Sequence, residues 1–595
     1  MTLATQSPSL WSPEFEIETR PDGTIVMQQT GALPSAERSI PDSLVKWAKA
    51  TPEATFIAQR GDDGDWRRVS YATALGYVRA LGTGMLQLGL GPDRPLLILS
   101  ENSIEHAMLG LAAQYVGVPY APLSTAYSLV STDHGKLKDI ARLLRPGLVF
   151  ATDGQAYAAA LQSIADLGHT ALNVRNPAKG ALLYDDLLAT PPGPNADAAF
   201  AALTGDTVGK YLFTSGSTGS PKAVINSQAM MTSNQTLIAD CYRFVMDRPP
   251  VVVDWAPWNH TAAGNKVFNM VLTNGGTYYI DEGKPTPALI GKTIRNLKDI
   301  SPTWYFNVPA GYDMLVEAMK SDDALRQSFF KDLDMMMYAG AGMAQHTWDD
   351  LLRLSCETVG HEVLLATGLG STETGPFALM CTDRQTKAGN VGVPALGITL
   401  KLVPNGDKLE ARLKSPSITP GYLGDPDKTA EMLDDEGYYC IGDALRPADP
   451  DDLTKGFFFD GRTAENFKLG TGTWVAVGAL RASMIDHFGG LIRDAVIVGE
   501  GREHLGAILI AQNLADVGTA NNREALQDRL NSFAKQASGS SNRVMRAIVI
   551  DTPPDIDKGE VTDKGSINQR AVISNRPDLV ETLFSDAPTV LHATR

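Results

Sequence analysis

One segment constrains this chain more than any other: residues 211–224, which read YLFTSGSTGSPKAV. An apolar run enters a stretch of glycine, serine and threonine that ends in Pro221 and Lys222. Glycines let backbone N–H groups converge on a phosphate, and hydroxyl side chains donate hydrogen bonds to its oxygens. The segment therefore predicts a strand followed by a loop that binds phosphate groups.

The common phosphate loop G-x-x-x-x-G-K-[ST] does not fit this segment. Counted from Gly216, Pro221 stands where the second glycine belongs, and Ala223 stands where Ser or Thr belongs. The chain also has no G-x-G-x-x-G and no G-x-S-x-G, which removes the dinucleotide-binding and nucleophile-elbow interpretations.

Further segments follow the loop in order, and together they resemble one family. They are residues 255–261 (WAPWNHT), 338–344 (YAGAGMA), 367–373 (TGLGSTE), 437–443 (GYYCIGD) and 459–462 (FDGR). This set resembles the acyl-adenylate-forming superfamily, which contains acyl-CoA synthetases, peptide-synthetase adenylation domains and firefly luciferase. The resemblance covers about residues 40–575.

Other strings are similar to those of bacterial feruloyl-CoA synthetases, the hydroxycinnamate:CoA ligases of that superfamily. They are residues 257–261 (PWNHT), 307–309 (NVP), 368–376 (GLGSTETGP), 470–475 (GTGTWV) and 562–570 (TDKGSINQR). The last two are unusual in the wider superfamily, so they carry most of this assignment.

The resemblance implies a ligase that uses ATP, Mg²⁺ and coenzyme A. The carboxylate of an aromatic acid would attack the α-phosphorus of ATP to give acyl-AMP and pyrophosphate, and the CoA thiol would then displace AMP. Both steps need charge neutralisation more than covalent help from the protein.

The resemblance also implies the residues that bind the nucleotide. They are Thr214, Ser215, Gly216, Ser217, Thr218, Gly219, Lys222, Gly340, Ala341, Gly342, Asp443 and Arg462. Thr372 would contact the α-phosphate, and Glu373 would hold the metal, because Mg²⁺ prefers carboxylate oxygen. Asp443 would accept both ribose hydroxyls, and Arg462 would reach the ribose from a hinge.

The remaining expected residues concern the acyl and thiol substrates. Lys564 would bridge the carboxylate and the α-phosphate, with Lys558 as the alternative, because Ser566 stands where the superfamily usually has this lysine. His260 would line the carboxylate end of the acyl pocket. The pocket would be a flat, mostly apolar slot; its expected residues are Trp258, His260, Gly340, Gly342, Gly368 and Gly370. Lys468, Gly472 and Trp474 would line the CoA channel.

The length of 595 residues requires more than one hydrophobic core. Alternating apolar strands and amphipathic helices predict an α/β fold with a largely parallel sheet. We expect a large domain over residues 1–461, made of stacked α/β sheets and a small β-barrel-like subdomain, and a small mobile α+β domain over residues 462–595. Residues 1–40 are expected to form an N-terminal extension. The secondary-structure predictions are helices over 41–50, 71–90, 104–116 and 523–537, and strands over 94–100, 148–152, 399–403, 409–413, 495–498, 507–510 and 546–550.

A net charge of −16 argues against binding to nucleic acid or to an anionic membrane, since both need a basic surface. The N-terminus does not resemble a signal peptide, and no apolar run is long enough for a bilayer. These features predict a cytoplasmic enzyme whose partners are small molecules. They leave the oligomeric state open, a homodimer included.

Several alternatives stay open at this point. The acid could be another aryl acid of the benzoate or salicylate type. The chain could load a separate carrier protein, although no fused carrier domain is expected after Arg570. A luciferase-like oxidase and an inactive binding protein are less well supported. Ala-Thr-Arg at the terminus is not a peroxisomal signal, and Lys222, Glu373, Asp443 and Arg462 are all present.

Overall fold

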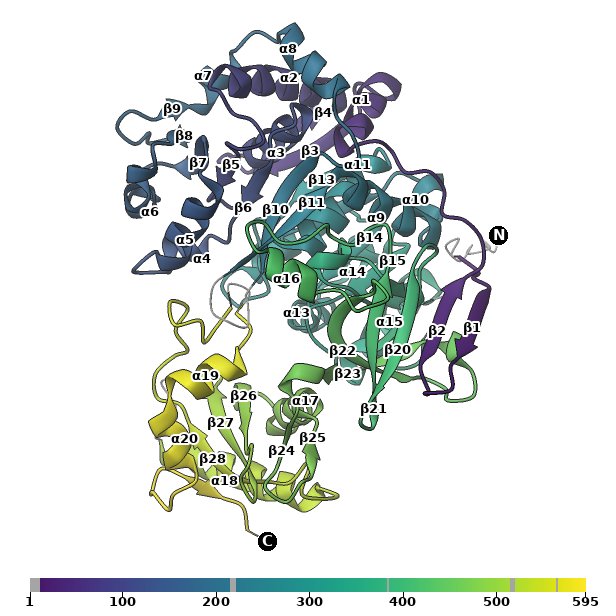
Figure 1. The fold of residues 1–595 in the computed structure, drawn as a ribbon, viewed down its shortest axis with the longest axis vertical. Helices are drawn as coiled ribbons and strands as arrows, with labels where there is room; N and C mark the ends of the chain where they lie inside the picture. The colour runs from purple at the N-terminus through teal and green to yellow at the C-terminus, as the bar shows by residue number, and fades with distance from the viewer. Residues whose placement is uncertain (1–10, 215–220, 382–384, 514–518, 563–564, 595) are drawn as a thin grey trace.

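The computed structural model describes residues 11–214, 221–381, 385–513, 519–562 and 565–594. A large N-terminal part carries sheets covered by helices, and a smaller C-terminal part (lime to yellow) lies below it in Figure 1. The predicted α/β class is therefore confirmed. In the described residues, no helix has the length and apolar character needed to span a bilayer.

A seven-stranded sheet lies at the centre of the first half of the chain and has the order β11-β10-β6-β5-β7-β8-β9. All neighbours are parallel except β10 and β11, so the prediction of a largely parallel sheet is confirmed. The strands are β5 (Leu96–Ile98), β6 (Tyr120–Pro122), β7 (Leu148–Asp153), β8 (Thr170–Arg175), β9 (Leu182–Leu183), β10 (Val208–Thr214) and β11 (Lys222–Ser227).

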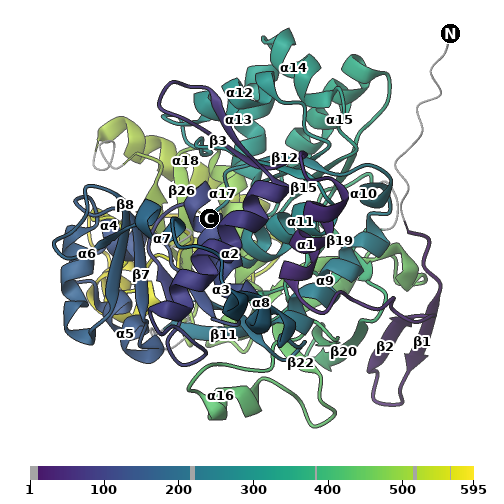
Figure 2. The same ribbon diagram turned by 90° about the horizontal axis from the view of Figure 1, so that it is seen from above.

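Helices cover both faces of this sheet (Figure 2), which explains why its inner strands β5 and β6 are buried along their whole length. Leu96 and Ile98 of β5 pack into one core with α3, while Leu97 and Leu99 pack into another with α5. The helices of this region are α1 (Ile40–Ala50), α2 (Tyr71–Gln87), α3 (Ile104–Tyr115), α4 (Ala126–Leu129), α5 (Gly135–Leu144), α6 (Ala158–Ser163), α7 (Tyr184–Leu188), α8 (Pro194–Ala201) and α9 (Gln228–Cys241).

Two smaller sheets continue the α/β architecture. One has the order β12-β13-β3-β4 and the other β14-β15-β16, and they adjoin where the Thr303 amide donates to the Val251 carbonyl at 2.9 Å. Their strands are β3 (Thr55–Arg60), β4 (Trp66–Ser70), β12 (Val251–Asp254), β13 (Thr277–Ile280), β14 (Trp304–Asn307), β15 (Met335–Tyr338) and β16 (Leu364–Ala366). Around them lie α10 (Phe244–Asp247), the π-helical turn η2 (Ala262–Val267), α11 (Phe268–Thr273), α12 (Ile290–Asp299), α13 (Pro309–Met319), α14 (Asp323–Phe330) and α15 (Gln345–Val359).

The expected β subdomain is larger than the sequence indicated. It is an antiparallel nine-stranded sheet with the order β1-β2-β20-β21-β22-β23-β19-β18-β17. Residues 15–29 are not a simple extension, because β1 and β2 form a hairpin that pairs with β20 (Figure 1). The strands are β1 (Phe15–Thr19), β2 (Ile25–Gln29), β17 (Gly368–Leu369), β18 (Leu379–Met380), β19 (Asn390–Pro394), β20 (Thr399–Asn405), β21 (Lys408–Lys414), β22 (Tyr439–Pro447) and β23 (Phe457–Arg462), with α16 (Pro426–Glu431) between β21 and β22.

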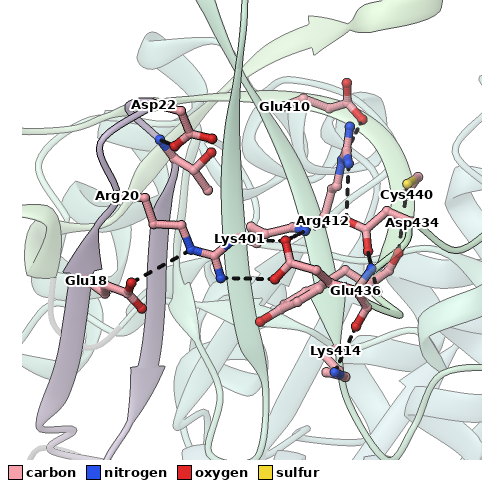
Figure 3. Close-up of polar contacts among 12 residues, drawn as sticks. Glu18, Arg20, Asp22, Lys401, Glu410, Arg412, Lys414, Asp434, Glu436 and Cys440 are labelled. Atoms are coloured by element: carbon pink, nitrogen blue, oxygen red, sulfur yellow. Dashed lines mark hydrogen bonds and ion pairs between the residues drawn. The ribbon is translucent and has the colours of Figure 1, made fainter.

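A cluster of charged side chains, Arg20, Lys401, Arg412, Asp434 and Glu436, ties this hairpin to the sheet (Figure 3). Lys401 of β20 is buried and pairs with both Asp434 and Glu436. Arg20 donates two hydrogen bonds to Glu436, and Arg412 pairs with Asp434 at 3.1 Å. Every buried charge in this cluster therefore has at least one opposite charge beside it.

The C-terminal part contains a four-stranded mixed sheet, β26-β27-β28-β29, with α17 and α18 packed into its core. Strand β23 still belongs to the nine-stranded sheet and ends at Arg462, and β24 begins at Phe467. The boundary at residues 461/462 stays a prediction. The elements are β24 (Phe467–Lys468), β25 (Trp474–Val475), α17 (Val477–Phe488), β26 (Ile492–Val498), β27 (Leu505–Ala511), α18 (Ala520–Gln536), β28 (Val544–Val549), α19 (Gln569–Asn575), α20 (Pro577–Leu583) and β29 (Leu591–His592).

Candidate functional site

The expected phosphate loop connects the two antiparallel strands of a hairpin, β10 and β11. Thr214, the last residue of β10, pairs with Lys222, the first residue of β11. The connection is thus strand to strand, unlike a Walker A loop, which leads into a helix. Five of the expected loop residues lie outside the described residues: Ser215, Gly216, Ser217, Thr218 and Gly219.

Tyr422 connects this hairpin to Glu373. The Lys222 ammonium lies 5.0 Å from the centroid of the Tyr422 ring, and the Tyr422 hydroxyl donates to Glu373 Oε1 at 3.0 Å. Burial, and then the charge of Glu373, raise the pKa of Tyr422, so its hydroxyl stays a donor. The tyrosine is held beside β11 by backbone bonds from Ile225 N to Gly421 O (3.0 Å) and from Leu423 N to Ala223 O (2.9 Å).

Thr372 and Glu373 form a short 3₁₀ turn, η3 (Thr372–Thr374), and both are buried. The Glu373 carbonyl accepts a hydrogen bond from the Thr419 amide at 2.8 Å. The described residues contain no cluster of three or more His, Cys, Asp or Glu side chains suited to a metal ion. A single carboxylate still fits Mg²⁺, which is commonly held by one or two carboxylates together with substrate phosphates.

Asp443 and Arg462 lie opposite each other on neighbouring strands, β22 and β23. Arg462 Nε is 3.4 Å from Asp443 Oδ1, which has no hydrogen-bond partner among the described residues. Asp443 is only 6% exposed, and burial raises its pKa to about 6 although Arg462 opposes the shift. The two residues expected at the ribose are therefore brought together, and the Asp443 carboxylate retains an oxygen without a hydrogen-bond partner among the described residues.

Tyr439 shows that the Asp443 pair and the Glu373 turn belong to one region. It lies on β22, the strand of Asp443, and is buried. Burial first, then the nearby charges of Glu373 and of Asp443, raise its pKa. Residues from four of the recognised segments, together with Tyr422, thus lie in one region.

The glycine-rich segments need glycine for two reasons: a positive φ at one position and close backbone contacts at two others. Gly340 has φ +89°, and with Ala341 and Gly342 it forms an exposed turn after β15. A Cβ on Gly368 would lie 2.4 Å from the Leu379 carbonyl oxygen. A Cβ on Gly370 would collide with the Pro376 carbonyl. Close backbone approach accounts for these two glycines, and their place in an acyl slot stays a prediction.

Trp258 and His260 lie in the turn that precedes η2. Trp258 is buried, donates from Nε1 to the Tyr278 hydroxyl at 2.9 Å and packs edge-on against Phe268. His260 is half-buried, and its carbonyl accepts the Gly264 amide at 2.8 Å. Trp258 is part of the core, whereas His260 lies closer to the surface at the start of the helical turn.

Lys564 lies outside the described residues, but a segment that precedes it in the sequence contacts the large domain. The Asp557 carboxylate accepts hydrogen bonds from the Thr132 amide and hydroxyl, both at 3.0 Å. Lys558, the alternative lysine, is exposed and directly follows this contact.

The three residues expected at the CoA channel lie on the small hairpin β24–β25. Lys468 pairs with Trp474 across the hairpin, with its ammonium 4.9 Å from the indole, and Gly472 has φ +83° in the turn. Trp474 is 49% exposed and lines a cavity of about 460 Å³. The lining also includes Lys408 of the large domain, but none of the residues expected at the nucleotide.

Family models identify the chain. A model described as AMP-binding enzyme matches residues 44–423, and one described as AMP-binding enzyme C-terminal domain matches residues 477–588. This chain belongs to the AMP-binding enzyme family.

Curated AMP-binding enzymes match it at low identity. A carboxylic acid reductase of Segniliparus rugosus is 26% identical over 412 residues, which are 64% of this chain and 33% of that protein. The 4-coumarate--CoA ligase 3 of Oryza sativa subsp. japonica is 24% identical over 87% of this chain and 90% of its own length. A feruloyl-CoA synthase of an Amycolatopsis species is 25% identical over 67% of this chain and 74% of its own length.

The chain spans between about a third and under half of the length of the carboxylic acid reductases that it matches. The A domain of one of them also shares its fold. The A domain of the S. rugosus reductase, solved with AMP and a co-purified carboxylic acid, has a TM-score of 0.70. It is 19% identical and covers 92% of this chain, which in turn covers 94% of that chain.

Two residues outside the recognised motifs have contacts that only the structure reveals, Tyr422 and Lys266. The aromatic residue in the string TPGYLGD resembles an ordinary core position, and only its Glu373 contact reveals more. Lys266 stands among apolar residues in the string NKVFNMVL, which is a detectable signal, because a lysine there points to a buried charge.

Proposed function

We propose that this AMP-binding enzyme is an ATP-dependent ligase that converts a hydroxycinnamic acid such as ferulate to its CoA thioester through an acyl-AMP intermediate. The observation that carries the proposal is the Asp443–Arg462 strand pair beside the Lys222–Tyr422–Glu373 chain of contacts. These residues come from distant segments, and each has the chemistry that one part of ATP requires.

In the first half-reaction, a carboxylate oxygen of the acid forms a bond to the α-phosphorus, and the bond from that phosphorus to pyrophosphate breaks. Lys222 and the N–H groups of its loop would neutralise the phosphates, and Thr372 would donate to the α-phosphate. Ionised Asp443 would accept both ribose hydroxyls, which supplies the partners that its buried oxygen lacks.

Glu373 would hold Mg²⁺, which would supply positive charge at the phosphate oxygens. Tyr422 fixes the carboxylate for this role, because its hydroxyl donates to one oxygen from a buried position. The chain's own contribution is therefore an oriented hard-oxygen ligand next to a lysine.

In the second half-reaction, the CoA sulfur attacks the acyl carbon, the bond to the carboxylate-derived oxygen breaks, and AMP leaves with that oxygen. We propose that the Lys468–Trp474 hairpin lines the thiol channel after the C-terminal domain, residues 462–595, turns about the segment near Arg462. Rotation about a hinge is a known device for two-step sites. His260 and Lys564 would position the acid and the α-phosphate.

A second candidate is an adenylation module that passes the acyl group to a carrier protein. The matches to carboxylic acid reductases favour this alternative, because a solved structure of the S. rugosus reductase joins the matched A domain to a PCP domain. The two candidates share the first half-reaction and differ in the thiol that accepts the acyl group.

The test is pyrophosphate release across a panel of acids: ferulate, p-coumarate, caffeate, cinnamate, benzoate and a fatty acid. We expect ATP-dependent release with the hydroxycinnamates and a CoA thioester when CoA is added. Acyl-AMP without thioester would favour the carrier candidate. Release with the fatty acid alone, or with none of the acids, would overturn the proposal.

A further inference from the structure

Lys266 is a buried lysine in the helical turn η2 (Ala262–Val267), which begins two residues after His260. Only 3% of it is exposed. Its ammonium donates to the Tyr242 hydroxyl at 3.1 Å and lies 2.7 Å from the Met337 sulfur. A phenol and a thioether are weak acceptors for an ammonium group, so these contacts leave the charge under-compensated.

Aromatic rings surround the same ammonium. The ring centroids of Phe377, Tyr242 and Trp304 lie 4.7, 5.2 and 5.8 Å away. Their faces attract a cation, but among the described residues no carboxylate pairs with it. Burial accordingly lowers the pKa of Lys266 to about 7.

Polar atoms without partners accumulate in the same helical stretch. Asn265 Oδ1 and both amide atoms of Asn269 are buried and have no hydrogen-bond partner among the described residues. The same holds for Gln235 Oε1 on the facing helix α9. Buried polar atoms are nearly always satisfied in folded proteins, so a concentration of exceptions suggests a place that binds water or ligand.

The position of Lys266 relates it to the acyl substrate. Met337 lies on β15 just before the Gly340 turn, and Trp304 lies on the neighbouring strand β14. His260, at the expected carboxylate end, is six residues before Lys266, which corresponds to about 9 Å or somewhat less along a helix. A planar acid with a ring and a short unsaturated side chain has this length, whereas a benzoate is shorter.

We propose that Lys266 donates a hydrogen bond to an oxygen substituent on the ring of the acid, at the end away from the reacting carboxylate. It would thereby select hydroxylated aromatic acids over unsubstituted ones. The oxygen would replace the contact with Met337, whose unbranched thioether side chain can move at little cost. This inference rests on the proposed function, and it names the ring oxygen as the substrate feature that the same site recognises.

The test compares p-coumarate with cinnamate, which differs only by the ring hydroxyl. For the wild-type enzyme we expect kcat/KM in pyrophosphate release to favour p-coumarate by tenfold or more, because a site built to bind a hydroxyl rejects the analogue that lacks it. In Lys266→Met, which keeps the side-chain length, the ratio should fall to near one through loss with p-coumarate. Lys266→Gln, which keeps a donor, should retain part of the preference.

Lys401→Met is the matched control, since it removes a buried lysine far from the proposed slot, and its preference ratio should equal that of the wild type. An unchanged ratio in Lys266→Met would overturn the inference. Equal losses with both acids would overturn it too, because they indicate a structural role only.

A binding measurement separates this inference from the proposed function. Trp304 lies beside the Lys266 ammonium, so tryptophan fluorescence should report the affinity of each acid without turnover. If no acid releases pyrophosphate, the ligase proposal fails. Tighter binding of p-coumarate that is lost in Lys266→Met would still support the role of Lys266, and equal binding of both acids would contradict it.

Discussion

Two carboxylates of the nine-stranded sheet region, the half-buried Asp434 and the buried Asp443, have opposite charge environments. Asp434 precedes β22 and pairs with Lys401 and Arg412, and although burial opposes the shift, these hydrogen bonds lower its pKa to about 2. Asp443 lies within β22 and has Arg462 alone at 3.4 Å, so burial raises its pKa to about 6.

The buried lysines repeat the contrast. Burial opposes ionisation of Lys401, but its two carboxylate partners raise its pKa, whereas burial lowers the pKa of Lys266. The charged cluster of Figure 3 balances its charges internally and fastens the N-terminal hairpin to the sheet. Asp443 and Lys266 lack such balance, which is costly for folding unless a ligand completes them. This contrast supports the proposal that Asp443 and Lys266 lie where this protein binds its substrates.

The strongest test of the charged cluster around Lys401 is the substitution Asp434→Asn. The change leaves buried Lys401 with one carboxylate fewer and removes the partner of Arg412. We expect it to lower the free energy of unfolding by about 3 kcal/mol, measured by urea unfolding, since breaking a buried ion pair strands its partner. Asp435→Asn removes a neighbouring exposed charge and should have almost no effect. Equal losses of unfolding free energy in the two variants would contradict the claim that this cluster stabilises the fold by pairing its charges.

Asp443 should change protein stability with pH in the opposite direction to Asp434, because its pKa is raised and that of Asp434 is lowered. Because its folded pKa is raised, it contributes stability that is present below about pH 4 and is lost as the pH rises through about 6. The proposed contact with the ribose, in contrast, would need the ionised form of Asp443. We expect adenosine affinity to fall about tenfold per pH unit below 6, measured by calorimetry, with adenosine used because it carries no titrating phosphate. Asp443→Asn should bind more weakly with no such slope, and a wild-type affinity that is flat between pH 5 and 7 would contradict the account.

The smallest expected effect concerns the stability of Lys266→Met. Replacing an uncompensated buried ammonium with an apolar side chain of similar length should change the free energy of unfolding by less than about 1 kcal/mol, or increase it. Lys401→Met, which strands carboxylates, should cost more. Thermal unfolding of the two variants compares them directly, and a larger loss for Lys266→Met would show that Lys266 is a structural residue.

Local pattern predicted much of the fold. Helix α3 and strands β7, β26 and β27 appear where apolar periodicity placed them, because each is buried as a unit. The hairpin β1–β2 was not predicted, since most of its residues are exposed or half-buried and its partner β20 lies hundreds of residues away. Register between such distant strands is set by tertiary packing and not by local sequence.

The same division holds for the site. Motif order predicted that Asp443 and Arg462 would act together, and they are cross-strand partners. It could not predict the Tyr422–Glu373 hydrogen bond, because the two residues meet only through the fold. The buried state of Lys266 likewise follows from Tyr242, Trp304 and Phe377, which come from separate elements.

The central claim is that the acid's own carboxylate attacks the α-phosphorus of ATP, and isotope transfer tests it most directly. The enzyme would be incubated with ATP, CoA and ferulate labelled with ¹⁸O in the carboxylate, and the products analysed by mass spectrometry. We expect feruloyl-CoA together with AMP that carries one ¹⁸O atom. Label in phosphate or pyrophosphate instead, or turnover that leaves AMP unlabelled, would contradict an acyl-AMP intermediate.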